Sequence, residues 1–239
     1  MNSKLTKFAL TATLGLAITF TLNACGGGDS IKDSRDGKTY KTVKIGEQVW
    51  MAENLNYAAK GSKCGGTDVQ TQEVAETEET DSYTIEYYLV VEENTVNCDK
   101  YGRLYNWETA MKACPSGWHL PSKDEWQILV NLAGGEGAGK KLNATSGWND
   151  YEVGWGDGMN KTSRNGEDAF GFSALPGGYG YSRSGVFQYV GSHGYWWSST
   201  EESSSGGAYG WTSGVYGANE FSSNPESKSF FFSIRCIQN

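Results

Sequence analysis

Residues 40–50 alternate between apolar and polar side chains on both sides of Gly46-Glu47. A period of two is the pattern of a strand with one buried face. A two-residue step that contains glycine, placed between two such runs, is typical of a tight hairpin turn. We therefore predict a β-hairpin over residues 40–50.

Two later segments show the three- and four-residue spacing of amphipathic helices. The first spans residues 105–114 and ends before Pro115, and the second begins at Ser122 and ends at Gly134-Gly135. Ser122 and Glu125 have the spacing of a capping box. The residues predicted to face the core are Trp107, Ala110, Met111 and Cys114 in the first helix, and Trp126, Leu129, Val130 and Ala133 in the second.

Beyond residue 134 the chain consists of short aromatic segments separated by glycine. The sequence holds 32 Gly, 14 Tyr, 9 Trp and 9 Phe, a composition that in this arrangement is typical of loop-rich β-structure. Residues 228–237 predict a final strand. Helices followed by strands indicate an α+β fold, and the length suits one domain with a substantial core.

The first 25 residues have the layout of an export signal. Lys4 and Lys7 precede an uncharged, mostly apolar run over residues 8–22, which is short for a membrane span. The run ends in LNAC, which resembles a lipoprotein signal with Cys25 as the acylated residue; an ordinary secretory signal is the alternative. We predict a signal peptide over residues 1–24, a flexible tether over 25–35 and a folded domain over 36–239.

Acylation of Cys25 implies a location in the cell envelope. Two or more acyl chains anchor a protein stably, whereas one chain does so only marginally. Gly26 follows the cysteine, where Asp would favour the inner membrane, so we expect the outer membrane. Removal of a leader with two lysines and no acidic residue makes the formal charge of −8 still more negative, which argues against nucleic acid as a partner.

An acidic stretch without any Lys or Arg lies between residues 64 and 99. We predict a solvated insertion over about 65–97, with one strand over residues 84–91. The stretch lacks the Asp-x-Asp-x-Asp-Gly spacing that closes oxygen ligands around calcium. We therefore expect no cofactor, with calcium as the open alternative.

Four cysteines remain after Cys25, an even number in an exported chain. They are Cys64, Cys98, Cys114 and Cys236, and two disulfides are the natural expectation. Four cysteines allow three pairings. A zinc site is the competing use, but the sequence has no Cys-x-x-Cys pair, and its histidines are His119 and His193.

Six ordered blocks resemble the Fibrobacter succinogenes major paralogous domain over about residues 36–239. They are VWMAENLNY at 49–57, YGRLYNW at 101–107, ACPSGWHLPS at 113–122, FGFSALPGG at 170–178, GYWWSSTE at 194–201 and SIRC at 233–236. More distantly, residues 117–126 are similar to the formylglycine-generating sulfatase-modifying family, and both families resemble the C-type lectin-like fold. The acidic stretch is longer than the loop expected at that place in the family.

The resemblance implies a C-type lectin-like fold, with two helices packed on short antiparallel sheets. In that fold a disulfide joins a helix to the last strand, which implies the pairs Cys114–Cys236 and Cys64–Cys98. The second pair would close the base of the acidic insertion.

For function we expect a non-catalytic binding module for polysaccharide or a surface protein, using aromatic rings and polar neighbours in the C-terminal half. The ligand-binding candidates are Trp155, Tyr181, Arg183, Tyr195, Trp197, Glu201 and Trp211. Core packing is the alternative for each ring, and of Trp196 and Trp197 at least one is expected in the core, because neighbouring strand residues face opposite ways.

Three other readings compete with this one. Trp148-Asn149-Asp150 is the tripeptide that binds calcium in true C-type lectins, but here it lies far from the final cysteine. A formylglycine-generating-like enzyme would need a reactive cysteine, but two disulfides would leave none of the four cysteines as a free thiol. We expect no catalytic residue and no metal site, and a scaffold for protein partners remains the third alternative.

Overall fold

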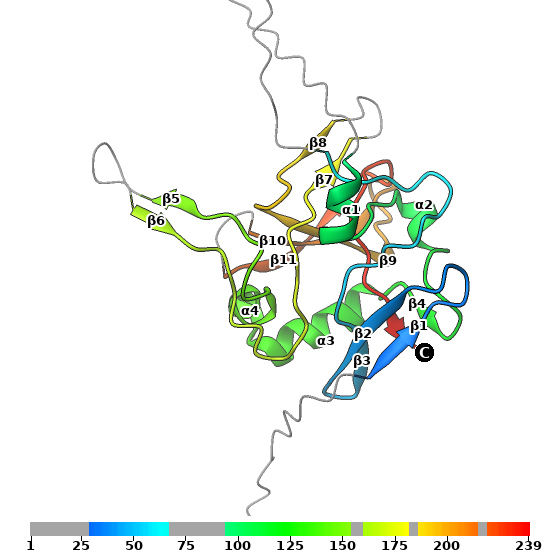
Figure 1. Cartoon of the computed structure of the whole chain (residues 1–239), viewed down its shortest axis with the longest axis horizontal. Coiled ribbons are helices and arrows are strands. Elements are labelled where there is room, and N and C mark those ends of the chain that lie inside the picture. The colour runs from blue at the N-terminus through cyan, green and yellow to red at the C-terminus, as the bar shows by residue number, and fades with distance from the viewer. Residues whose placement is uncertain (1–28, 67–93, 154–159, 182–185, 215–218) are drawn as a thin grey trace, which may run out of the picture.

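The computed structural model describes residues 29–66, 94–153, 160–181, 186–214 and 219–239. Within these residues, short helices and curled antiparallel sheets form an α+β fold, as predicted (Figure 1). The strand predicted over residues 84–91 lies outside the described part of the chain.

A five-stranded sheet brings the two ends of the domain together. Its order is β1 (Ser30–Lys32), β2 (Thr39–Ile45), β3 (Gln48–Met51), β12 (Ile237–Gln238) and β4 (Trp118–His119). β2 and β3 form the predicted hairpin around Gly46, whose φ of 60° is the left-handed conformation that glycine adopts without strain. Ile237 lies between Trp50 and His119, so the last strand is held on both sides.

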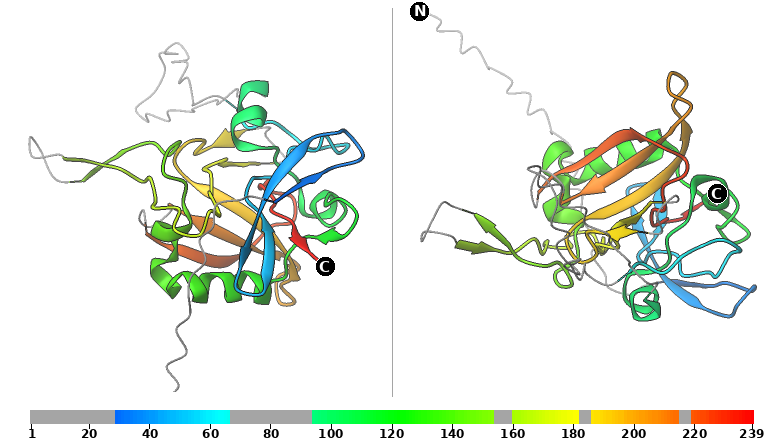
Figure 2. Two further views of the ribbon diagram at one scale, coloured as in Figure 1. Left: turned by 60° about the horizontal axis from the view of Figure 1, so that its bottom comes forward. Right: turned by 90° about the horizontal axis from the view of Figure 1, so that it is seen from above.

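A second sheet has three strands, in the order β11 (Phe221–Glu226), β10 (Ala208–Ser213) and β9 (Gly194–Glu201) (Figure 2). Two small hairpins complete the strands. They pair β5 (Tyr151–Val153) with β6 (Asn160–Thr162), and β7 (Tyr179–Gly180) with β8 (Phe187–Gln188).

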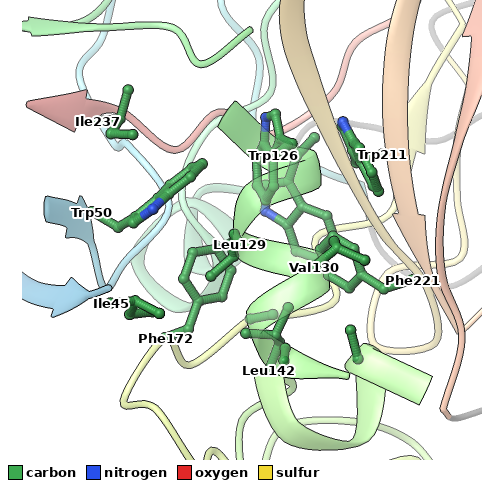
Figure 3. Packing of buried hydrophobic residues seen from close by; sticks show 14 of the residues in the cluster. Ile45, Trp50, Trp126, Leu129, Val130, Leu142, Phe172, Trp211, Phe221 and Ile237 are labelled. Carbon is green, nitrogen blue, oxygen red and sulfur yellow. The ribbon is translucent and has the colours of Figure 1, made fainter. Parts of the chain in front are cut away.

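Helix α3 (Lys123–Ala133) lies between the two larger sheets and provides the centre of the main core. It begins with the predicted capping box, in which Ser122 and Glu125 each bond the other's backbone, and it ends at Gly134 in the left-handed conformation. The ring of Trp126 packs 4.9 Å from Trp50 on one side and 6.1 Å from Trp211 on the other (Figure 3). All four residues predicted to face the core from this helix are buried. A 3-10 turn, η1 (Gly135–Gly137), and helix α4 (Ala138–Leu142) follow.

The first predicted helix is much shorter than residues 105–114. Helix α2 covers only Trp107–Ala110, because the backbone N–H groups of Lys112 and Ala113 bond carbonyls three residues back, which tightens the chain out of α geometry. Met111 consequently turns outward and is 43% exposed, so its predicted place in the core was wrong.

Two further elements differ from expectation. Helix α1 (Thr95–Tyr101), capped by Asn94, has no counterpart among the predicted helices. The predicted final strand over 228–237 contracts to β12, because the chain before it crosses between sheets and makes one bridge each with Tyr105, Gly180 and Trp196. A strand that changes partner at every step forms no continuous ladder.

Both disulfides have the pairing that the resemblance implied. Cys64 bonds Cys98 across the insertion, with a sequence separation of 34 residues, and Cys114 bonds Cys236 with a separation of 122. All four cysteines that follow Cys25 are thereby engaged.

The segment predicted as a tether, residues 25–35, contains strand β1 and the buried carboxylate of Asp33. That carboxylate accepts hydrogen bonds from Nε and Nη2 of Arg35 at 2.9 and 2.6 Å. Arg35 in turn donates to the carbonyl of Ala113 at 2.8 Å and lies 3.8 Å above the ring of Tyr57. This ion pair fastens the beginning of the domain to the segment after α2.

Replacing Asp33 with Asn is expected to lower the free energy of unfolding at pH 7 by about 2 kcal/mol, the scale of charge-assisted hydrogen bonds. The hydrogen bonds from Arg35 lower the pKa of Asp33, so its contribution is complete above the unfolded value of about 3.9 and is lost as the pH falls through the folded value. Urea unfolding at pH 7 and at pH 2 measures this, with exposed Asp36→Asn as control. An equal loss at both pH values would contradict the assignment.

Candidate functional site

Five aromatic rings gather where hairpin β7–β8, strand β9 and the C-terminal segment meet. We call this group the tyrosine cluster; it consists of Tyr179, Tyr181, Tyr189, Tyr195 and Phe230. Tyr179 lies at its centre, with ring centroids 5.0 Å from Tyr181, 4.9 Å from Tyr195 and 5.9 Å from both Tyr189 and Phe230. Most of these pairs are tilted or edge-on, the arrangement that aromatic rings prefer.

Two glycines make this close assembly possible. A Cβ on Gly178, whose φ is +65°, would lie 2.3 Å from the carbonyl oxygen of Gln188. On Gly180 it would lie 2.8 Å from the ring of Phe187. The Gln188 carbonyl belongs to the hairpin backbone, and the buried ring of Phe187 would have to shift to make room, so glycine at both positions allows the close approach on either side of Tyr179.

The phenol groups of the cluster are neutral hydrogen-bonding groups. The hydroxyl of Tyr179 lies 2.6 Å from that of Tyr181 and 2.9 Å from Oε1 of Gln188. Burial, followed by the hydrogen bond with Tyr181, raises the pKa of Tyr179 well above its ordinary value. Tyr179 therefore presents an uncharged hydroxyl beside apolar ring faces at neutral pH.

Tyr189 is the most open ring of the cluster, at 50% exposure. Its φ of 62° is a left-handed conformation that bulky side chains rarely adopt and that costs about 1–3 kcal/mol. The turn is held because the backbone N–H groups of Ser192 and His193 both bond the Tyr189 carbonyl, at 2.9 and 3.0 Å. Residues in such conformations concentrate at functional sites, so Tyr189 marks this surface as a binding candidate.

Tyr181 and Tyr195, both predicted as ligand contacts, are half-buried members of the tyrosine cluster. Tyr195 also stacks on Phe232 at 5.2 Å, so one of its faces is covered. Trp155 and Arg183 lie outside the described residues.

Trp197 and Trp211 belong to the core, which corrects their prediction as ligand contacts. Trp197 is fully buried, stacks 4.3 Å from Phe232 and donates from Nε1 to the Tyr105 carbonyl at 2.8 Å. Trp211 is 2% exposed and stacks on Trp126. The physical reason is that the β9–β10–β11 sheet is covered on both faces, by α3 on one side and by the C-terminal segment on the other.

Glu201, the remaining predicted contact, is exposed and forms an ion pair of 3.2 Å with Lys228. Lys228 lines a cleft of about 620 Å³ beside the C-terminal segment, which we call the polar cleft. Its lining residues are Asn106, Glu108, Ser205, Gly206, Gly207, Pro225, Glu226, Ser227, Lys228 and Ser229. Burial raises the pKa of Glu226. Ser229, one of the lining residues, directly precedes Phe230 of the tyrosine cluster in the sequence.

The remaining candidate groups have structural partners. His119 lies 3.0 Å from Glu125 and 2.8 Å from Asn239, and Trp148 is buried and donates to the Ala174 carbonyl at 3.0 Å. Within the described ranges no group of three or more His, Cys, Asp or Glu residues could hold a metal ion. In the same part of the chain no helix has the length and apolarity needed to cross a bilayer.

Sequence reasoning missed Phe230 and the polar cleft. Phe230 was included in a predicted strand, where its contact with Tyr181 at 5.1 Å has no sequence signal. The aromatic run over residues 230–232 was the available hint, because three consecutive rings cannot all face one core.

Comparison with known proteins agrees with the sequence blocks. The model of the Fibrobacter succinogenes major domain matches residues 43–238. The chain matches no curated protein and no solved structure. Since the family match covers most of the sequence and nearly all of the folded part, the chain belongs to the Fibrobacter succinogenes major domain family.

Proposed function

We propose that the chain is a lipid-anchored, non-catalytic binding module of the outer membrane that holds polysaccharide on the tyrosine cluster. The observation that carries the proposal is Tyr189, a half-exposed ring in a strained conformation that stacks on Tyr179, the central ring of the cluster. Rigid aromatic surfaces of this kind bind with little loss of side-chain entropy, because the rings are already immobilised by their neighbours.

The chemistry of the cluster suits a sugar. The C–H face of a pyranose packs against a flat ring, and its hydroxyls exchange hydrogen bonds with neutral phenols and amides. Tyr179, Tyr181 and Gln188 supply such groups, because the Tyr179 hydroxyl lies 2.6 Å from that of Tyr181 and 2.9 Å from Oε1 of Gln188. The polar cleft, whose lining includes Ser205, Ser227 and Ser229, offers further hydroxyls.

The architecture supports the finer proposal of a C-type lectin-like fold. The first and last strands share one sheet, and a disulfide joins the segment after α2 to the residue before β12. The anchor proposal rests on Cys25. Since β1 begins at Ser30, the few intervening residues span at most about 18 Å, which would hold the domain close to the bilayer.

Replacing Tyr189 or Tyr181 with Ala is expected to weaken polysaccharide binding by about 10- to 100-fold, because each removes a central aromatic contact. The measurement is calorimetry of the purified protein, disulfides intact, against plant and bacterial polysaccharides, with calcium and with chelator. Tyr209→Ala is the matched control. Tyr209 is a half-buried tyrosine on β10 whose ring lies 3.7 Å from the ammonium group of Lys123 on α3, away from the tyrosine cluster.

The proposal fails if no polysaccharide binds, or if Tyr209→Ala weakens binding as much as Tyr189→Ala does. Failure with every polymer would favour a protein partner at the envelope. Loss of binding in chelator alone would show that calcium takes part.

A further inference from the structure

Two buried side-chain nitrogens have no hydrogen-bond partner among the residues that the structure describes. They are Nε of Arg164 and Nδ1 of His193. Buried polar groups are nearly always paired, so each unpaired one requires a physical explanation. Nε1 of Trp211 is also unpaired, but it belongs to a nearly fully buried core residue, whereas Arg164 and His193 are only partly buried.

Three loops bring these two side chains to the edge of the tyrosine cluster. The backbone N–H of Asn149 bonds the Gly191 carbonyl at 2.6 Å, and that of Trp148 bonds the side chain of Asn165 at 3.1 Å. The segments around residues 149, 165 and 191 are therefore fastened to one another. The ring of His193 lies edge-on to Tyr189, with centroids 4.4 Å apart.

The electrostatic state of the pair favours a negative ligand. The guanidinium of Arg164 lies 4.4 Å from the ring of Tyr151 and forms no ion pair with any described carboxylate. Burial and, secondarily, the charge of Arg164 lower the pKa of His193 to about 4. His193 is therefore neutral at pH 7, with Arg164 as the charge acting on it and the rings of Tyr189 and Tyr195 beside it.

We propose that Arg164 and His193 form an anion subsite that binds the carboxylate of an acidic sugar whose ring rests on Tyr189. The planar fork of an arginine matches a carboxylate, and a neutral imidazole N–H donates to the same group. This inference rests on the proposed polysaccharide function, and it identifies the ligand class as polysaccharides that contain uronate residues. The net charge of −8 repels polyanions in general. A preference for an acidic over a neutral sugar would therefore have to come from the local pair of Arg164 and His193.

Histidine NMR tests the subsite directly, because His119 and His193 are the two histidines of the sequence. The purified protein is titrated with sodium glucuronate, with its methyl ester, with glucose and with inorganic phosphate. Glucuronate is expected to raise the pKa of His193 by about one unit or more, since a carboxylate stabilises the imidazolium. The ring signals of His119 should stay in place, and the methyl ester and glucose should leave the signals of both histidines unchanged.

Arg164→Gln is expected to weaken glucuronate binding at least about 10-fold while leaving neutral polysaccharide binding intact. An equal response to glucuronate and its methyl ester, or an equal response to phosphate, would overturn the acidic-sugar assignment. Neutral polysaccharide binding that is sensitive to Tyr189→Ala would meanwhile show that the wider proposal holds. Failure of the acidic-sugar subsite can thus be distinguished from failure of the wider polysaccharide proposal. The titrations with the four ligands use the unmodified protein, so they do not depend on whether a variant folds.

Discussion

Replacing Cys114 and Cys236 together with Ala is expected to lower the free energy of unfolding by about 4–5 kcal/mol. The bond closes a loop with a sequence separation of 122 residues, and in the chain-entropy model a bond across such a loop restricts the unfolded chain by about that amount. It also connects the short segment after α2 to the last strand. Denaturant unfolding, followed by tryptophan fluorescence, measures the change.

The matched control is the double replacement of Cys64 and Cys98 with Ala. That bond closes a loop with a separation of only 34 residues, so its loss should cost about 3–4 kcal/mol. If removing the Cys114–Cys236 bond costs clearly less than removing the Cys64–Cys98 bond, then loop length does not govern their contributions.

Replacing Arg235 with Met is expected to destabilise the protein by about 3–5 kcal/mol. The guanidinium is completely buried and donates to the carbonyls of Phe172 and Ser173 and, at 2.9 Å, to Oδ1 of Asn54. Removing the guanidinium leaves the carbonyl oxygens of Phe172 and Ser173 without this donor, at a cost of about 1–3 kcal/mol each. The same Asn54 oxygen accepts from Nε1 of Trp196 at 2.9 Å, so the change also loosens the main core.

Two companion variants separate the effect of the planar hydrogen-bonding geometry of Arg235 from the effect of its burial. Arg235→Lys keeps the positive charge but lacks the planar fork, and it should still cost more than about 2 kcal/mol. Arg103→Met removes a partly buried guanidinium that bonds Ser62 at 2.8 Å, and it should cost less, because water can replace it. An Arg235→Met protein within 1 kcal/mol of the unmodified one would show that apolar packing compensates for the lost hydrogen bonds.

The elements that sequence predicted correctly depend on local signals. The hairpin β2–β3 follows from alternation around Gly46, and the beginning and end of α3 follow from Ser122, Glu125 and Gly134. These signals act within a few residues and do not depend on the rest of the fold. The disulfide pairing came instead from the family resemblance, because cysteine spacing alone left three choices.

The tyrosine cluster and the burial of the tryptophans depend on contacts between distant segments. Alternation correctly placed one of Trp196 and Trp197 in the core, but it could not show that both faces of β9 are covered. The partners of Tyr179 come from residues as far apart as 181 and 230. That packing decides which rings reach the surface, so local sequence patterns could not distinguish Tyr189 from Trp197 as the exposed ring.

The most direct test of the central claim is an NMR spectrum of ring-labelled tyrosines, recorded with and without each polysaccharide of the panel. If the tyrosine cluster is the sugar-binding surface, the signals of Tyr181 and Tyr189 shift with at least one polymer, while that of Tyr209 stays in place. The claim is contradicted if no polymer shifts Tyr181 or Tyr189, or if the polymer that binds shifts Tyr209 instead.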